Sequence, residues 1–205
     1  MLGIRCCDQF GGPTSGQDAV FTFKIDPATG AIAETNRHNA TLGAGPRHAA
    51  WHPTKKIFYV LHEMGSFVAS YTVDSASGAL TEIGRVSTQP QRSSFSGYSK
   101  AAEIVATADG RNVIVSNRGY GPDSGGVTVF SVGPDGTLGH GIPHQVGDRF
   151  PRGIGLSPVG DGRTLIVAGQ EGSTLTKFTV NADGTLTQNG EPVPGPSHPT
   201  TVAFA

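Results

Sequence analysis

Three polar residues of this 205-residue sequence, His48, Glu103 and Arg152, could together carry acid–base chemistry. A His or Glu side chain can take a proton from water, most effectively when its pKa lies near the working pH. An Arg side chain can stabilise a developing oxyanion and can grip a carboxylate or phosphate through two parallel hydrogen bonds. Together these groups include what the hydrolysis of a neutral ester or lactone by activated water would need. The residue types alone do not rank His48 against Glu103 as the base.

Each of these residues also has a purely structural interpretation. His48 could cap a strand or bond to backbone, and Glu103 could be a buried carboxylate that needs a partner. Arg152 could be that partner. Four other polar residues are candidates either for substrate binding or, as the pattern favours, for hydrogen bonds between repeats: Glu63, Asn117, Arg118 and Gln170.

The candidates occupy matching places because the sequence repeats. A turn phrase rich in Asp and Gly recurs four times, and each copy follows an alternating strand and precedes a short apolar segment. Asp and Gly suit hairpin turns, since they tolerate positive φ or bond to their own backbone. The four phrases span 26–30, 74–78, 133–136 and 181–184.

A second hairpin lies upstream of each of the last three phrases, so a complete unit holds four strands. Units of about 40–50 residues with four strands are typical of β-propeller blades. The sequence therefore predicts an all-β fold, a β-propeller with four-stranded antiparallel blades in a single domain. Its units are a partial blade at 1–45, complete blades at 46–99, 100–148 and 149–195, and a lone closing strand at 196–205. Because propellers close with roughly four to eight blades, we expect an incomplete ring whose open edges could pair in a homo-oligomer.

The expected hairpins also predict where the candidate residues meet. The start of the first strand of a blade lies beside the end of its second strand, since the two are antiparallel. His48, Glu103 and Arg152 begin first strands, so we expect them to converge at one mouth of the central channel. Glu63, Arg118 and Gln170 end second strands at the same level, and Asp8 takes that place in the partial unit. The turns at the opposite end are predicted to be plain solvated turns.

Composition excludes several other classes of function. The formal net charge of −1 gives no reason to expect nucleic acid or an anionic membrane as partner, and no apolar run approaches the roughly 18 residues of a membrane span. No His/Cys cluster has metal-ligand spacing, and neither a GxSxG elbow nor a P-loop is present. We therefore expect a small-molecule substrate and no metal or other cofactor. The adjacent Cys6 and Cys7 favour a reducing, cytoplasmic location.

Four short motifs resemble those of a known family, the lactonase family of seven-bladed β-propellers. They are the GPRH phrase at 45–48, AAEI at 101–104, SNRG at 116–119 and FPRG at 150–153. The family includes propeller-type 6-phosphogluconolactonases and carboxy-cis,cis-muconate cyclases. The resemblance implies that this chain matches the C-terminal part of such a propeller, with about three N-terminal blades missing.

The resemblance also implies an activity and its residues. It predicts hydrolysis of 6-phosphogluconolactone or another sugar lactone to the aldonic acid, a step of carbohydrate metabolism in the pentose phosphate pathway. His48, Glu103 and Arg152 would be catalytic, and Arg92 is a further candidate from the family pattern. Arg47, Arg118 or Asn117 would hold the phosphate. The alternatives are a muconate cyclase-like reaction and a non-catalytic propeller that serves as a binding scaffold.

Overall fold

The computed structural model describes residues 2–5, 18–89, 99–119, 125–147 and 149–204, and every helix or strand assigned within these ranges is a β-strand. The strands form four antiparallel sheets, which we number in chain order. The first sheet contains β1 (Leu2–Arg5), β2 (Ala19–Ile25) and β3 (Ile32–Asn39). The second contains β4 (Pro46–Trp51), β5 (Ile57–His62), β6 (Phe67–Val73) and β7 (Leu80–Ser87).

The other two sheets follow the same up-and-down order. The third sheet contains β8 (Ser99–Ala106), β9 (Asn112–Gly119), β10 (Gly126–Val132) and β11 (Leu138–His144). The fourth contains β12 (Pro151–Leu156), β13 (Thr164–Gly169), β14 (Thr174–Val180), β15 (Leu186–Gln188) and β16 (Val193–Pro194), and both β15 and β16 pair with β14. The predicted all-β architecture of four-stranded antiparallel blades is confirmed.

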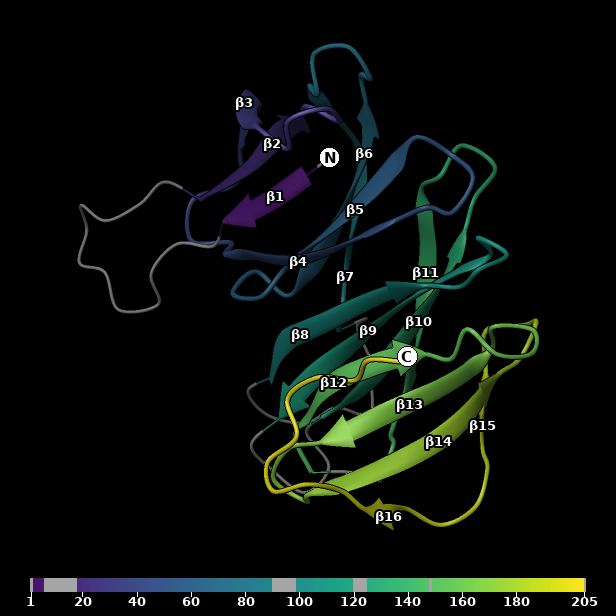
Figure 1. Ribbon diagram of the computed structural model, residues 1–205. Coiled ribbons are helices and arrows are strands. Elements are labelled where there is room, and N and C mark those ends of the chain that lie inside the picture. Colours follow the sequence, from purple (N-terminus) through teal and green to yellow (C-terminus); the bar gives the residue numbers. More distant parts are fainter. Residues whose placement is uncertain (1, 6–17, 90–98, 120–124, 148, 205) are drawn as a thin grey trace.

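The sheets succeed one another like the blades of a propeller (Figure 1). The first strand of each complete sheet lies innermost, and β8 contacts both β4 and β12. The functional candidates at the starts of these strands are therefore brought together from three different sheets. None of the described ranges contains a helix long and apolar enough to cross a membrane.

The turn phrases adopt the backbone that their composition predicts. In the first, the Asp26 carboxylate accepts hydrogen bonds from the backbone N–H groups of Ala28 and Thr29 at 2.8 and 2.9 Å. The glycine that ends each phrase has positive φ, between 72° and 89° across the four copies. This conformation costs glycine little because it has no Cβ. The repeated phrase thus closes a hairpin in every sheet, through a five-residue turn in the first two sheets and a four-residue turn in the last two.

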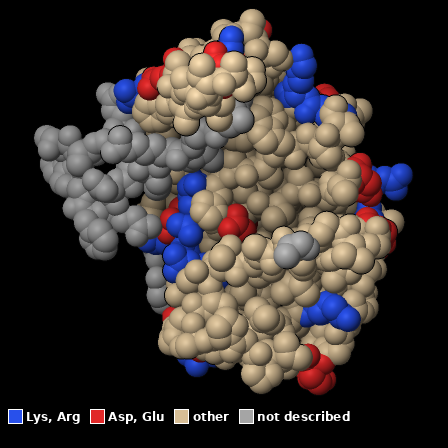
Figure 2. Space-filling view, viewed as in Figure 1, with Lys and Arg blue, Asp and Glu red and all other residues tan. Residues whose placement is uncertain are grey.

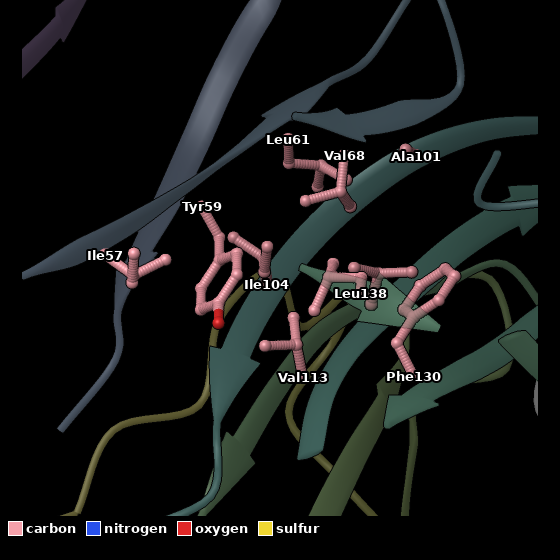
Figure 3. Close-up of a cluster of buried hydrophobic side chains, with 10 residues drawn as sticks. Ile57, Tyr59, Leu61, Val68, Ala101, Ile104, Val113, Phe130 and Leu138 are labelled. Atoms are coloured by element: carbon pink, nitrogen blue, oxygen red, sulfur yellow. The ribbon is translucent and has the colours of Figure 1, made fainter. Parts of the chain in front are cut away.

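Apolar side chains fill the spaces between neighbouring sheets. Figure 3 shows the cluster between the second and third sheets, where Tyr59, Leu61 and Val68 meet Ile104 and other residues of the third sheet. A second cluster joins the third and fourth sheets, and a third cluster lies within the second sheet and reaches β2 of the first. Side chains that alternate along each strand supply these clusters, so the sheet faces carry the core.

The turns at the end away from the candidate residues also connect sheets. Asp109 and Arg163, on turns of the third and fourth sheets, form an ion pair. The Lys55 ammonium donates to the Pro134 carbonyl at 2.7 Å, and the Tyr59 hydroxyl donates to the Gly136 carbonyl at 3.0 Å. The prediction of plain solvated turns therefore misses a row of contacts between blades.

The last part of the chain differs from the predicted lone strand at 196–205. The described residues 195–204 form no strand, and the segment passes over β12 at its glycines. A Cβ atom built on Gly153 would lie 2.7 Å from the Cα of Thr201, and one on Gly155 would lie 2.9 Å from a Val202 methyl. The absence of side chains on these glycines gives the segment room, but its backbone has no ladder partner in the described chain.

His62 is a buried histidine at the end of β5. Its ring stacks on Phe67 with 4.2 Å between centroids, and within the described residues neither ring nitrogen has a hydrogen-bond partner. Burial, with the nearby charge of Arg85, lowers the pKa of His62 to about 4, against the weaker opposing effect of Asp18 and Glu82. The native protein therefore holds this ring neutral.

The lowered pKa of His62 predicts acid destabilisation. Below about pH 6.5 the imidazole of His62 becomes protonated in the unfolded chain but stays neutral in the native chain. The free energy of unfolding therefore falls as the pH drops from 6.5 to about 4. The loss amounts to roughly 3 kcal/mol, and above pH 6.5 His62 makes no contribution to the pH dependence. Urea unfolding across this range measures it. His62→Phe should flatten the curve relative to that of the wild-type protein. Equal slopes in the two proteins would contradict the assignment.

Candidate active site

Each inner strand carries a β-bulge where the candidate residues lie. In β4, Pro46 pairs with His62 and His48 with Leu61, so Arg47 is an extra residue. In β12, Arg152 is extra in the same way. In β8, Ala102 and Glu103 lie opposite the single residue Ser116. Bulges re-aim side chains locally and are frequent beside active sites.

His48 and Glu103 form a hydrogen-bonded pair between the second and third sheets. The distance from His48 Nδ1 to Glu103 Oε1 is 2.6 Å. The Glu103 carboxylate also accepts the N–H of Ile104 at 3.1 Å, which fixes its orientation. The His48 side chain is 41% exposed and that of Glu103 is 19% exposed, so the pair is open to solvent on the imidazole side. With Glu103 ionised, Nδ1 carries the proton and Nε2 presents a lone pair.

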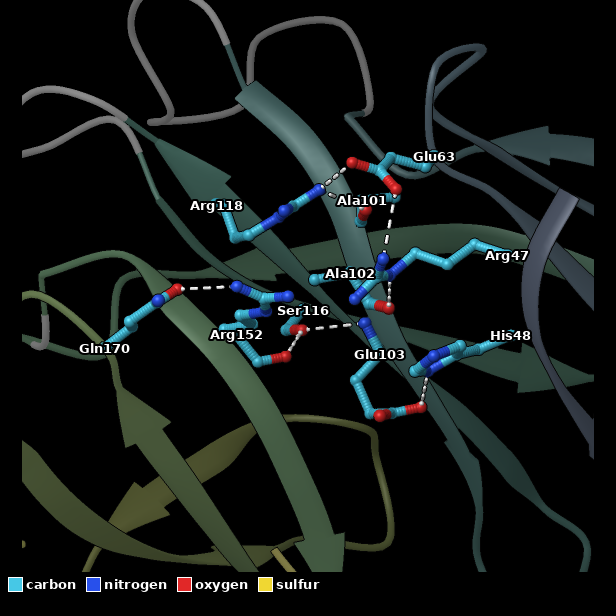
Figure 4. A network of polar contacts seen from close by, with 10 residues as sticks. All are labelled: Arg47, His48, Glu63, Ala101, Ala102, Glu103, Ser116, Arg118, Arg152 and Gln170. Atoms are coloured by element: carbon cyan, nitrogen blue, oxygen red, sulfur yellow. Dashed lines mark hydrogen bonds and ion pairs between the residues drawn. The ribbon is translucent and has the colours of Figure 1, made fainter. Parts of the chain in front are cut away.

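Glu63 lies between two arginines at the same end of the sheets (Figure 4). Its carboxylate is almost fully buried and pairs with Arg118 of the third sheet and, at 3.2 Å, with Arg47 of its own sheet. Burial raises the pKa of Glu63, but the hydrogen bond and charge of Arg118, aided by Arg47, outweigh it and leave the pKa lowered. Glu63 is therefore ionised and holds both guanidinium groups.

The same two arginines also bind the backbone of β8. Arg47 Nε donates to the Ala102 carbonyl at 2.8 Å, and Arg118 Nη2 donates to the Ala101 carbonyl at 3.3 Å. The Arg118 guanidinium lies 5.7 Å from the centroid of the Phe150 ring. Arg118 is thus enclosed by the second, third and fourth sheets, whereas Arg47 retains an exposed edge.

Arg152 comes from the bulge of the fourth sheet. Its Nη1 atom donates to Gln170 Oε1 at 3.1 Å, so its side-chain partner is Gln170 and not Glu103. Burial, followed by the positive charges of Arg47 and Arg118, lowers the pKa of Arg152, while Glu63 opposes the shift. Even a lowered arginine pKa leaves the group charged near neutral pH. The site therefore concentrates positive charge.

The remaining predicted residues divide into two groups. Asn117 is fully buried, and its amide donates to the Thr88 carbonyl at 3.1 Å and to the Thr128 hydroxyl at 3.3 Å, which is a structural contact between sheets. Arg92 and Asp8 lie outside the described residues.

Near the middle of the face seen in Figure 2, a column of Lys and Arg side chains lies close to an acidic side chain. Basic and acidic side chains thus lie side by side on this surface.

Two residues of the site were not selected from the sequence. Ser116 forms hydrogen bonds in the β8 bulge, although it stands in the SNRG motif. Phe150 has φ of 59°, where a bulky residue is strained, and the equivalent position before the β4 bulge is Gly45 with φ of 63°. A non-glycine residue where the repeat has a glycine was the signal that could have drawn attention to Phe150.

The comparisons with known proteins agree with this architecture. The model of the family described as "Lactonase, 7-bladed beta-propeller" matches residues 13–204. The chain belongs to this lactonase family. It is 31% identical over 156 residues to a 6-phosphogluconolactonase of Pectobacterium carotovorum and 38% identical over 117 residues to that of Bacillus subtilis. These alignments cover 75% and 57% of this chain, but only 45% and 31% of the two relatives.

A solved structure shows the same relation. The crystal structure of a protein from Lactobacillus plantarum matches 98% of this chain with a TM-score of 0.80 and 26% identity, and 57% of that chain is covered. This chain therefore spans a little over half the length of that solved protein and less than half the length of the two curated relatives.

The Glu63 ion pairs of this lactonase-family site can be tested by unfolding. Glu63→Gln leaves the buried Arg118 without a compensating charge, so the free energy of unfolding should fall by about 3–5 kcal/mol. Glu82→Gln is the matched control because it breaks a comparable pair with Arg85 that is far more exposed; its cost should stay below about 1 kcal/mol. Guanidinium unfolding curves measure both. Equal losses in the two variants would show that burial does not increase the contribution of the Glu63 ion pairs to the free energy of unfolding.

Proposed function

We propose that this chain carries the catalytic centre of a lactonase that hydrolyses 6-phosphogluconolactone or a related sugar lactone. The observation that carries the proposal is the 2.6 Å bond between His48 and Glu103, open to solvent on the imidazole side and adjacent to an arginine-rich surface. Relatives named 6-phosphogluconolactonase support the reaction class. The alternative of a binding scaffold gives no reason for an oriented, half-exposed imidazole.

The geometry favours His48 as the base and Glu103 as the group that orients it. Glu103 already accepts two hydrogen bonds on Oε1, from His48 and from the Ile104 N–H, and its side chain is the less exposed of the pair. A carboxylate that holds one imidazole nitrogen fixes the tautomer and stabilises the imidazolium that forms during the reaction. This geometry supports His48 as the base, a ranking that the residue types alone leave open.

The reaction then runs in two steps. His48 Nε2 takes a proton from water as the water oxygen bonds to the lactone carbonyl carbon, and the carbonyl oxygen becomes an oxyanion. Arg152 stabilises this charge. When the tetrahedral intermediate collapses, the bond from carbon to the ring oxygen breaks, and the His48 imidazolium returns its proton to that oxygen. The product is the open aldonic acid, and no group of the protein is consumed.

The surrounding arginines would bind the anionic part of the substrate. Arg47 has a partly exposed guanidinium held in place by Glu63 and the Ala102 carbonyl, so it can contact a phosphate with little loss of conformational freedom. Arg118 is enclosed and acts through its charge. The prediction of a cytoplasmic location fits a phosphorylated substrate and stays a prediction.

Removal of the imidazole should abolish most of the lactonase activity. His48→Gln is expected to lower kcat by roughly 10²–10⁴-fold, the usual contribution of a general base, with little effect on stability because the side chain is half-exposed. His140→Gln, at an exposed position on β11, is the matched control and should retain full activity. Lactone hydrolysis above the uncatalysed rate is the measurement. A wild-type chain that is folded but inactive, or an active His48→Gln variant, would contradict the proposal.

The role of Glu103 can be separated from that of the base. Glu103→Gln can present its amide N–H₂ to Nδ1 and so favours the wrong tautomer, and kcat should fall by roughly 10²-fold or more. Glu103→Asp keeps the charge but shortens the reach, and it should retain more activity than Glu103→Gln. A muconate lactone assayed in parallel tests the cyclase-like alternative. If Glu103→Gln retained more activity than Glu103→Asp, the negative charge of Glu103 would not be its contribution to the reaction.

A further inference from the structure

Ser116 stands out among the buried residues of the inner hairpins. It lies on β9 with no exposed surface, opposite the bulge that contains Glu103. The residues that lie opposite the corresponding bulges are Leu61 in the second sheet and Ala168 in the fourth. Both are apolar, so packing alone does not require a hydroxyl at this position. A buried polar group at one copy of an otherwise apolar position calls for a specific partner.

The Ser116 hydroxyl has two partners, and both are backbone groups of candidate catalytic residues. It accepts a hydrogen bond from the Glu103 N–H at 3.0 Å. It donates to the Arg152 carbonyl oxygen at 2.9 Å. Figure 4 shows the hydroxyl between β8, which carries Glu103, and β12, which carries Arg152. Bulges leave backbone groups without ladder partners, and one side chain here satisfies such a group in the third sheet and another in the fourth.

We propose that Ser116 is a positioning residue that fixes the separation between the His48–Glu103 pair and Arg152. The inference rests on the proposed function, since it concerns the same site. The apolar contacts between the third and fourth sheets are non-directional, whereas two hydrogen bonds to one oxygen constrain both bulges at once. The base and the oxyanion-stabilising group come from different sheets, so their relative placement depends on this constraint.

The same contacts exclude a direct chemical role for Ser116. Its side chain has no exposed surface, and its proton is given to a backbone carbonyl. A nucleophilic serine needs an adjacent base and access to the substrate, and Ser116 has neither arrangement here. Its effect on the reaction is therefore transmitted through the backbone of Glu103 and Arg152.

The test compares Ser116→Ala with Tyr59→Phe. Each substitution removes one buried hydroxyl that joins two sheets, but the Tyr59 hydroxyl bonds to the Gly136 carbonyl at the opposite end of the molecule. Ser116→Ala should lower kcat by roughly 10–100-fold, in the range of a small misplacement of catalytic groups, with KM changed less than about threefold. Tyr59→Phe should lose thermal stability to a similar degree but keep its kcat. Ser116→Thr restores a hydroxyl and should recover part of the activity.

A second readout keeps the test independent of activity. The His48 Nδ1 proton in its short bond to Glu103 should give a separate downfield proton resonance in NMR spectra. This resonance should shift or broaden in Ser116→Ala and stay in place in Tyr59→Phe, even if the wild-type chain hydrolyses no lactone. An unchanged resonance in Ser116→Ala, or a fall in kcat no larger than that in Tyr59→Phe, would overturn the positioning role. If the wild-type chain has no lactonase activity but the resonance still shifts in Ser116→Ala, only the proposed function is overturned.

Discussion

The buried carboxylate of Glu63 is the contact on which the geometry of this end of the molecule depends. A carboxylate cannot stay ionised away from water without compensating charge, and Arg47 and Arg118 supply it from two sheets. These arginines bind consecutive carbonyls of β8 as well, so the second and third sheets are fixed to each other beside the Glu103 bulge. Apolar residues of equal size often stabilise a protein as well as a buried ion pair does. What Glu63 supplies is therefore a defined geometry.

The bulges make that geometry useful for chemistry. Along a regular strand, side chains alternate between two faces, and both faces of an inner strand are needed for packing against neighbouring sheets. One extra residue releases a side chain from this alternation while the rest of the strand keeps its core contacts. Arg47, Glu103 and Arg152 all lie in such insertions. The fold thus offers polar groups to the inner surface without removal of apolar residues from the core.

The sequence predicted the repeat, the strand order and the common end of the candidate residues, because the Asp–Gly turns and the alternating strands are local signals. It also aligned Glu63, Arg118 and Gln170 correctly at the ends of second strands. The sequence did not predict the side-chain partners of these residues: Arg152 bonds to Gln170 and not to Glu103, and Asn117 forms hydrogen bonds within the core. Bulges carry no compositional signal in a six- to eight-residue strand, and the irregular path of 195–204 depends on glycines of a distant strand. Side-chain pairing between sheets is a tertiary property that no local pattern encodes.

Divergence within the repeat explains the charge of the site. Equivalent strand ends hold Glu63, Arg118 and Gln170, so one sheet supplies a carboxylate, the next a guanidinium and the third a neutral amide. A strict repeat of Glu or of Arg would place like charges together at the centre, which is unfavourable. With Arg47 and Arg152 included, this end of the sheets holds three guanidinium groups and the two carboxylates of Glu63 and Glu103, so arginines outnumber carboxylates. Burial, followed by the positive charges of Arg47 and Arg118, lowers the pKa of Arg152. A bound anion would offset those charges, so the proposed anionic substrate depends on the residue differences between blades and not on the fold they share.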